Sequence, residues 1–363
     1  MRKIRSILFI LLLALLGMLT GCTQKPTGPQ GKSYFNYFDT VSYVYSYAGD
    51  SAEQFNNRSA EVSNVLEEYH KLFDIYHEYS GMNNLCTVNR LAGGESVKVD
   101  EKLIDFMLYA RELYYETQGE MDVMLGSVLS IWHDCRTQAK DDPEMARVPT
   151  PEELQQAAGH SGFSLLEIDE AAGTLRITDP EASIDVGALG KGYATEMAAR
   201  YLESCGAQGY VLNIGGNIRI IGTKPDGGGW VTELRNPFGS EGESPISLEL
   251  ADTSCVTSGV YERYYTVDGQ RYHHIIDRKT LYPADYYAAI TVVTRDSALA
   301  DALSTALFCM PYEDGLKMAE SFTGVDVVWI FPDGRVEYTP GLEDRIENLD
   351  TDYSYQKQEA ESR

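Results

Sequence analysis

Positive charge is scarce in this sequence. Its 363 residues include 30 lysines and arginines against 55 aspartates and glutamates, a formal net charge of −25. Such an acidic surface repels phosphate backbones, which excludes non-specific nucleic-acid binding. An anionic ligand therefore needs a local positive site or a bound cation. The apolar fraction of 43% is large enough for a substantial core, so global disorder is excluded as well.

Paired cysteines are also lacking. The six cysteines are scattered, with no CxxC pair and no metal-ligand spacing, so isolated core thiols are the simplest interpretation. Tryptophan is rare, with 3 residues, whereas there are 25 tyrosines. Half-buried sheet faces account for most of that excess, and a ring-stacking pocket is the alternative.

The N-terminus carries a targeting signal. Basic residues at 2–5 precede an apolar run over 7–19, which is shorter than the roughly 20 residues of a membrane span. Small residues then lead directly to Cys22, as in the lipobox of bacterial lipoproteins. We expect a signal peptide over 1–21, a lipidated (palmitate-bearing) Cys22, and a flexible tether over 22–33. The mature protein would face the extracytoplasmic side of the cell membrane.

The hydrophobic pattern predicts many short strands and a few helices. Helical spacing of apolar residues predicts helices over 60–76, from 103 to about 119, after 191, and over 297–310. Short or alternating apolar runs predict strands over 40–47, 175–178, 183–186, 210–214, 218–221, 230–234, 246–250, 272–276, 289–294 and 325–331. Segregated helices and mixed sheets favour an α+β fold with a single large catalytic domain over 34–342 and a polar tail over 343–363.

A glycine-rich segment is the first candidate site. It reads Ser183-Ile-Asp-Val-Gly-Ala-Leu-Gly-Lys-Gly-Tyr193, so a strand ending at Asp185 leads into three glycines, Lys191 and a helix. Main-chain N–H groups at a helix start and a lysine ammonium suit a phosphate. The spacing is not that of a Walker A loop, because only two residues separate its first two glycines. A plain strand–helix turn with a surface lysine is the alternative.

Two later segments have turn and acid/base character. Gly215-Gly216, between two apolar runs, predicts a hairpin turn. Further on, His273 and His274 precede Asp277, a combination that suits either acid/base catalysis or metal binding. Neighbouring residues of a strand point to opposite faces, so only one of the two histidines faces a site.

A carboxylate inside an apolar helix is the last candidate. Asp301 and Thr305 are four residues apart and share one helix face. A buried carboxylate is costly unless it is paired or binds a cation, and carboxylate and hydroxyl oxygens suit Mg²⁺. Capping by Asp296 and Ser297 explains the first turn of this helix, but it does not explain Asp301.

Together these segments resemble the FAD:protein FMN transferase family, the ApbE-like lipoproteins. The similar stretch runs from Phe38 to about Leu342, and Gly119-x-x-Asp122 resembles the family's earlier flavin-contacting segment. The main motifs occur in the family's order: Asp185-x-Gly-Ala-x-Gly-Lys-Gly192, Asn213-Ile-Gly-Gly-Asn217, Thr257-Ser-Gly-x-Tyr-Glu-Arg263, His274-Ile-Ile-Asp277 and Ala300-Asp301-Ala-x-Ser-Thr305.

The resemblance implies an enzyme that takes FAD, releases AMP and joins FMN to a threonine or serine hydroxyl of a redox protein. It implies that His274 is the base acting on the acceptor hydroxyl. It implies Mg²⁺ ligands at the Ala188 main-chain carbonyl, Asp301 and Thr305. It implies FAD contacts at Phe38, Met121, Asp122, Asp185, Lys191 and Ile275. Mg²⁺ and Lys191 would then supply the positive charge that the acidic chain otherwise lacks.

Some positions depart from the family pattern. Residues 277–281 read Asp-Arg-Lys-Thr-Leu instead of Asp-Pro-x-Thr-Gly, and 121–124 read Met-Asp-Val-Met instead of Phe-Asp-Pro-Thr. Residues 80–83 read Ser-Gly-Met-Asn instead of Ser-Glu-Leu-Ser, and Glu196 replaces an aspartate. Two alternatives stay open: an FAD pyrophosphatase that yields FMN and AMP, and a flavin- or solute-binding lipoprotein without chemistry.

Overall fold

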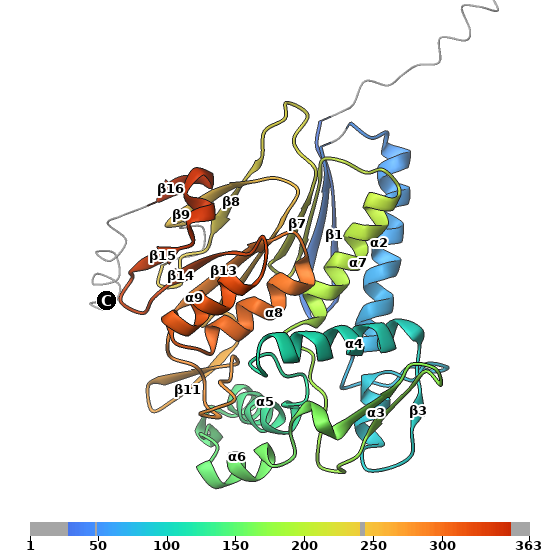
Figure 1. Cartoon of the computed structure of the whole chain (residues 1–363), viewed down its shortest axis with the longest axis vertical. Helices are drawn as coiled ribbons and strands as arrows, with labels where there is room; N and C mark the ends of the chain where they lie inside the picture. Colours follow the sequence, from blue (N-terminus) through green and yellow to red (C-terminus); the bar gives the residue numbers. More distant parts are fainter. Residues whose placement is uncertain (1–27, 48, 240–243, 350–363) are drawn as a thin grey trace, which may run out of the picture.

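The computed structural model describes residues 28–47, 49–239 and 244–349 (Figure 1). The expected signal peptide and Cys22 lie outside these residues. Within the described ranges, no helix has both the length and the apolar character needed to cross a membrane.

An eight-stranded sheet forms the centre of the molecule (Figure 1). Its strands lie in the order β1-β2-β6-β7-β10-β13-β14-β15, and every neighbouring pair is antiparallel. Their bounds are β1 Gln30–Tyr37, β2 Thr40–Ser46, β6 Tyr210–Ile214, β7 Asn217–Ile221, β10 Ser254–Gly259, β13 Ala289–Thr294, β14 Asp326–Ile330 and β15 Val336–Tyr338.

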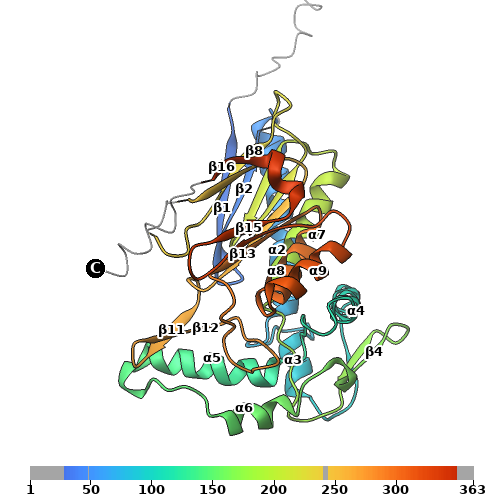
Figure 2. The ribbon, with the colours of Figure 1, turned by 60° about the vertical axis from the view of Figure 1, so that its left-hand side comes forward.

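The two faces of this sheet are covered differently (Figure 2). Helices cover one face: α2 Ala52–Phe73, α7 Gly190–Ser204, α8 Ser297–Phe308 and α9 Tyr312–Ser321. A three-stranded sheet covers much of the other: β8 Trp230–Leu234, β9 Ile246–Leu250 and β16 Ile346–Leu349. Strand β13 is buried along its whole length because Ile290 and Val292 pack toward the helices while Ala289 and Val293 pack toward the small sheet. The fold is therefore α+β, as predicted.

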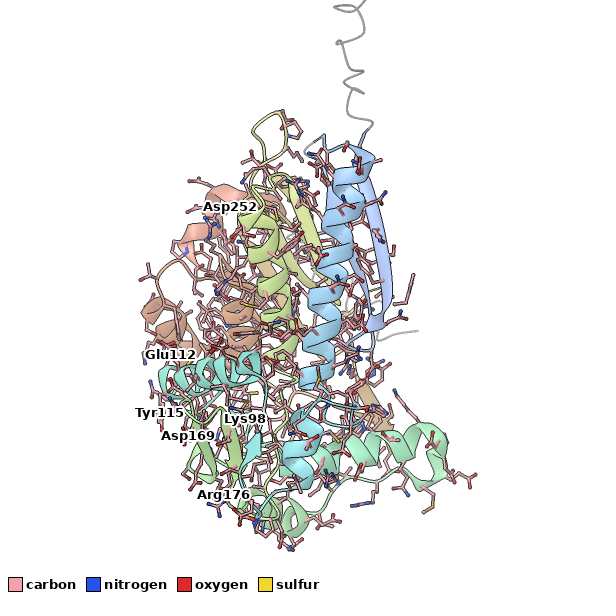
Figure 3. All side chains as sticks on the ribbon, turned by 90° about the vertical axis from the view of Figure 1, so that its right-hand side faces the viewer. Lys98, Glu112, Tyr115, Asp169, Arg176 and Asp252 are labelled. Carbon is pink, nitrogen blue, oxygen red and sulfur yellow. The ribbon has the colours of Figure 1, made fainter. Side chains whose placement is uncertain are left out.

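A smaller group of elements lies at one end of the central sheet, below it in Figure 1. Its helices are α3 Leu85–Arg90, α4 Glu101–Glu116, α5 Gly126–Asp141 and α6 Pro151–Ala158, with short 3-10 turns η1 Pro143–Met145 and η2 Phe163–Leu165. Its strands are β3 Val97–Lys98, β4 Leu166–Asp169, β5 Thr174–Ile177, β11 Tyr264–Val267 and β12 Gln270–His273. Figure 3 labels Glu112 and Tyr115 on α4 close to Lys98 and Asp169 of the small β3-β5-β4 sheet, against which α4 packs.

Most of the predicted elements are present, with corrected bounds. The helix predicted over 60–76 begins eight residues earlier, where Ser51 and Gln54 form a capping box, and it ends at Phe73. The strand predicted over 183–186 is wrong, because this extended stretch has no ladder partner in the described structure. The strand predicted over 272–276 ends at His273.

Both ends of the predicted domain also need correction. The tether was expected to reach Ser33, but β1 begins at Gln30 and pairs with β2. The tail was expected from 343, but residues 340–345 form the 3-10 turn η3 and β16 pairs with β9. Both strands are largely exposed and lie at sheet edges, so they lack the buried apolar alternation from which strands are predicted.

Candidate active site where α7, α8 and β12 meet

The glycine-rich segment forms a tight turn that starts α7. Asp185 Oδ1 accepts a hydrogen bond from Gly187 N at 2.8 Å, and Val186 O accepts one from Gly190 N at 2.8 Å. The residue before the helix, Leu189, has no side-chain acceptor to cap it. The first N–H groups of α7 therefore need an acceptor from elsewhere.

Asp301 of α8 supplies one of these acceptors. Its Oδ2 accepts a hydrogen bond from Gly192 N at 2.7 Å, and the residue is only 4% exposed. A Cβ at position 192 would collide with Asp301 Cβ and with Ser297 O, so only glycine allows the two helices this close. The other carboxylate oxygen, Oδ1, lies 3.8 Å from Lys191 Nζ.

Asp301 and Thr305 of α8 carry oxygen atoms of the kind that bind Mg²⁺. Within the described residues, neither Asp301 Oδ1 nor the Thr305 hydroxyl has a hydrogen-bond partner, so both can ligate a cation. Ala188 lies in the turn just before α7. The described chain holds no group of three or more His, Cys, Asp or Glu side chains placed for a metal. Mg²⁺ commonly binds through one or two carboxylates, with phosphates and water completing its shell, so a single carboxylate with two neutral oxygens suits it.

The two histidines after β12 have different environments, as the sequence predicts. His273 is fixed in the protein: Nε2 lies 2.8 Å from Ala284 O, and Nδ1 accepts from Ile275 N at 3.3 Å. His274 Nδ1 is buried without a hydrogen-bond partner in the part of the chain described. Burial, followed by the charge of Arg263, lowers the pKa of His274 to about 3. His274 is therefore neutral at physiological pH and able to accept a proton.

A cluster of cationic and aromatic side chains next to His274 was missed from the sequence. Arg136 Nη2 donates to His133 Nδ1 at 3.0 Å, and the Tyr76 ring lies 5.2 Å from the His133 ring. The charges of Arg136 and Arg263 act on His274 and also on Asp185, which places all four in one region. Neither arginine forms an ion pair with any described residue. The three-residue spacing of His133 and Arg136 on one helix was the available signal.

Burial is also the main influence on Asp185. It raises the pKa of this carboxyl, while the hydrogen bond from Gly187 and the nearby charges of His133 and Arg263 lower it. Asp185 N donates to Val123 O at 2.9 Å, which fixes the 121–124 segment beside the glycine turn.

The other predicted FAD contacts are Phe38, Met121, Ile275 and Asp122, and they lie in different surroundings. Phe38 occupies the β1–β2 turn with a positive φ of 54°, and its ring meets the His70 ring at 5.5 Å. Met121 and Ile275 are buried in the hydrophobic core. Asp122 Oδ1 accepts from Met124 N at 2.9 Å, its Oδ2 is buried without a partner in the described structure, and burial raises its pKa.

The 277–281 segment, which departs from the family pattern, contacts the two residues just before the departing 121–124 segment. Arg278 Nη1 donates to Gly119 O at 2.8 Å, and Lys279 Nζ lies 2.5 Å from Glu120 Oε1. Leu281, in the same segment, has a positive φ of 64°, which is uncommon for a residue other than glycine. The side chains of Arg278 and Lys279 therefore connect the 277–281 segment to the residues just before Met121.

Comparisons with known proteins agree with this geometry. An FAD:protein FMN transferase from Treponema pallidum is 30% identical over 327 residues, covering 86% of this chain and 87% of that protein. One from Vibrio cholerae is 31% identical over 262 residues, covering 72% and 75%. The crystal structure of the ApbE protein from Thermotoga maritima superposes with a TM-score of 0.76 at 27% identity, covering 87% of this chain and 99% of that one. The model of the ApbE family matches residues 39–329, and this chain belongs to that family.

Proposed function

We propose that this chain is an FAD:protein FMN transferase that joins FMN to a threonine or serine hydroxyl of a redox protein and releases AMP. One observation carries the proposal. Within an ApbE fold, α7, α8 and the segment after β12 bring together a lysine, a buried carboxylate with a free oxygen, and a neutral histidine.

Binding of FAD depends on local charge. The chain carries a net charge of −25, yet Lys191, Arg136 and Arg263 all act on the region of His274. Cationic groups around a diphosphate offset its charge in a partly buried site, where electrostatic interactions are stronger than in water. The three side chains therefore attract the dinucleotide to a protein that repels it elsewhere.

A divalent cation completes this site. We propose that Asp301, Thr305 and the Ala188 carbonyl hold Mg²⁺, because they offer one free carboxylate oxygen and two neutral oxygens. When bound, the ion neutralises charge that develops on the diphosphate oxygens. Gly192 N holds the second carboxylate oxygen of Asp301 in place.

The transfer step forms a bond between the acceptor oxygen and the phosphorus of the FMN half of FAD. The bond from that phosphorus to the bridging oxygen breaks, and its electron pair leaves with AMP. The hydroxyl proton passes to a ring nitrogen of His274, which is neutral because burial lowers its pKa to about 3. An anionic diphosphate in the site would raise the pKa of His274 and make it a better base.

Mass spectrometry tests the activity directly. The purified protein is incubated with FAD, Mg²⁺ and a flavinylation acceptor domain, and a control domain has its acceptor hydroxyl residue replaced by alanine. We expect the mass of one FMN group on the first domain only, together with AMP. Free FMN and AMP formed at a rate that the acceptor does not change would instead identify a pyrophosphatase. Tight FAD binding without turnover would identify a binding protein.

We also propose that a lipid on Cys22 anchors the protein to the extracytoplasmic face of the membrane. The basic start, the short apolar run and the small residues before Cys22 support this. Residues 23–29 separate Cys22 from the start of β1. Labelled palmitate should appear on the protein but not on the Cys22→Ser variant, and an unlabelled wild-type protein would contradict the anchor.

A further inference from the structure

We infer that Glu196 is a positioning residue that sets α8 against α7 so that Asp301 is held for its ligand. This inference rests on the proposed function only for the identity of that ligand. Glu196 lies on α7, is 5% exposed, and reaches the first turn of α8. It touches neither Lys191 nor Asp301 by any hydrogen bond or ion pair among the described residues.

Helices α7 and α8 exchange two reciprocal hydrogen bonds, one turn apart. At the first, Gly192 N of α7 donates to Asp301 Oδ2 of α8 at 2.7 Å. At the second, Ser297 N of α8 donates to Glu196 Oε2 of α7 at 3.1 Å. Positions 192 and 196 are four apart, as are 297 and 301, so both bonds lie on one shared face. A displacement of the Asp301 or the Glu196 carboxylate therefore moves one helix against the other and shifts the second carboxylate as well.

Two arginines, the buried Arg219 and the exposed Arg200, hold the Glu196 carboxylate in this position. Arg219 of β7 has no exposed surface, and its Nε lies 3.4 Å from Glu196 Oε2. Arg200 Nε donates to Glu196 Oε1 at 3.1 Å, and Arg200 Nη2 donates to Asp296 Oδ2 at 3.1 Å. Asp296 in turn caps α8, accepting from Ala298 N and Leu299 N. Because a buried charge is stable only with its partners present, this arrangement allows Glu196 few alternative positions.

The outer part of the same network ends on Glu203 and Asp252. Arg219 Nη2 donates to Glu203 Oε1 at 2.7 Å, and Arg295 bridges Glu203 to Asp252, which is labelled in Figure 3. Glu203 shares the ion pair with Arg219 and also pairs with Arg295, which precedes the α8 capping residue, but among the described residues it forms no hydrogen bond or ion pair with the first turn of α8. It is therefore a matched control: removing it disturbs the network without touching the α7–α8 bonds.

The experiment compares Glu196→Gln, Glu196→Asp and Glu203→Gln in the otherwise unchanged protein. Metal affinity is measured by titrating Mn²⁺, a spectroscopic substitute for Mg²⁺, and local order is measured by hydrogen exchange at the Gly192 amide. We expect Glu196→Gln to weaken Mn²⁺ binding about 10- to 100-fold, the usual effect of losing a group that orients a metal ligand. The Gly192 amide should also exchange faster. Glu196→Asp should fall between Glu196→Gln and wild type, because its shorter side chain reaches Ser297 less well.

Thermal unfolding of each variant separates positioning from simple loss of structure. Glu203→Gln should lower stability while leaving Mn²⁺ affinity and Gly192 exchange at wild-type values. Unchanged Mn²⁺ affinity and unchanged Gly192 exchange in folded Glu196→Gln would overturn the inference. Both readouts are independent of catalysis. If wild type transfers no flavin but these shifts occur, the proposed function fails and the positioning role stands.

Discussion

The two sides of the site differ in whether their charged side chains are paired within the protein. On the α7–α8 side, the buried carboxylates have partners within the protein: Glu196 is held by Arg219 and Arg200, and Asp301 by Gly192 N. On the side formed by α5 and the loop before β11, Arg136 and Arg263 form no ion pair among the described residues.

On the α7–α8 side the protein itself pairs the charged groups, whereas on the other side it leaves cationic groups for a ligand to pair. The internally paired side is already rigid, because its hydrogen bonds fix the free oxygen of Asp301 before anything binds. On the cationic side, Arg136 and Arg263 repel each other, and a bound anion would relieve this repulsion. A diphosphate lying between the two sides satisfies both.

Removing Asp301 should have the largest effect, because it destroys the paired side. We expect Asp301→Ala to reduce transfer about 10³-fold or more, the scale of losing a main electrostatic group, and excess Mg²⁺ should not restore it. Mass spectrometry of the acceptor measures the residual rate. Asp301→Asn keeps an oxygen that can accept the hydrogen bond from Gly192 N but loses the negative charge. This variant therefore distinguishes the effect of the lost charge from the effect of the lost hydrogen bond. Full activity in Asp301→Ala would show that Asp301 is not a metal ligand.

Removing the base should cost less and leave binding intact. We expect His274→Gln to lower kcat about 10²- to 10⁴-fold, the range for general-base catalysis, with little change in FAD affinity. His273→Gln is the comparison, because His273 is hydrogen-bonded within the protein and should act mainly through stability. A fall in FAD affinity that matches the fall in kcat would contradict the role of His274 as the general base.

Neutralising the cationic side should mainly weaken FAD binding. We expect Arg263→Gln to raise the Kd for FAD about 10-fold, the equivalent of about 1.4 kcal/mol, with a weaker dependence on salt. Arg271→Gln is the matched control, because Arg271 stacks on the Tyr264 ring instead, 4.8 Å from its centre. Flavin fluorescence at several salt concentrations measures both. Equal losses in the two variants would show a general charge effect.

Acid should destabilise the protein through His274. The unfolded chain binds a proton at this residue near its ordinary pKa of 6.5, whereas burial lowers the folded pKa to about 3. The unfolded state therefore holds more protons in this window. Between pH 7 and pH 5 this group alone should lower the free energy of unfolding by up to about 2 kcal/mol.

Urea unfolding of wild type and His274→Gln at the two pH values measures this contribution, which should be missing from the variant. His160 contributes to the pH dependence of stability with the opposite sign. Its hydrogen bond with Asp179 raises the pKa of His160, so protonation of this side chain favours the folded state. Replacing His160 should therefore make the acid destabilisation steeper. A pH dependence that is the same in wild type and His274→Gln would show that His274 is not buried in its neutral form.

Local sequence signals predicted the elements that carry the site. Asp301 is buried on α8 as its apolar surroundings indicate, and Gly215 and Gly216 form the β6–β7 turn with φ of 59° and 92°. The starts of α2 and α6 were not predicted, although both have capping boxes, at Ser51 and Thr150.

The rest depends on contacts between residues far apart in the sequence. Glu196 looked like a conservative change from aspartate, yet it binds Ser297 N, 101 residues away. Arg136 and Arg263 are separated by η1, η2, α6, α7 and several strands, so no local pattern joins them. Only the fold shows which charges have partners and which are left for a ligand.

A structure of the protein with FAD and Mg²⁺ tests the central claim most directly. We expect the ion to bind Asp301 Oδ1 and the diphosphate to lie between the ion and the guanidinium groups of Arg136 and Arg263. A diphosphate bound away from α8, or an ion on other ligands, would contradict it.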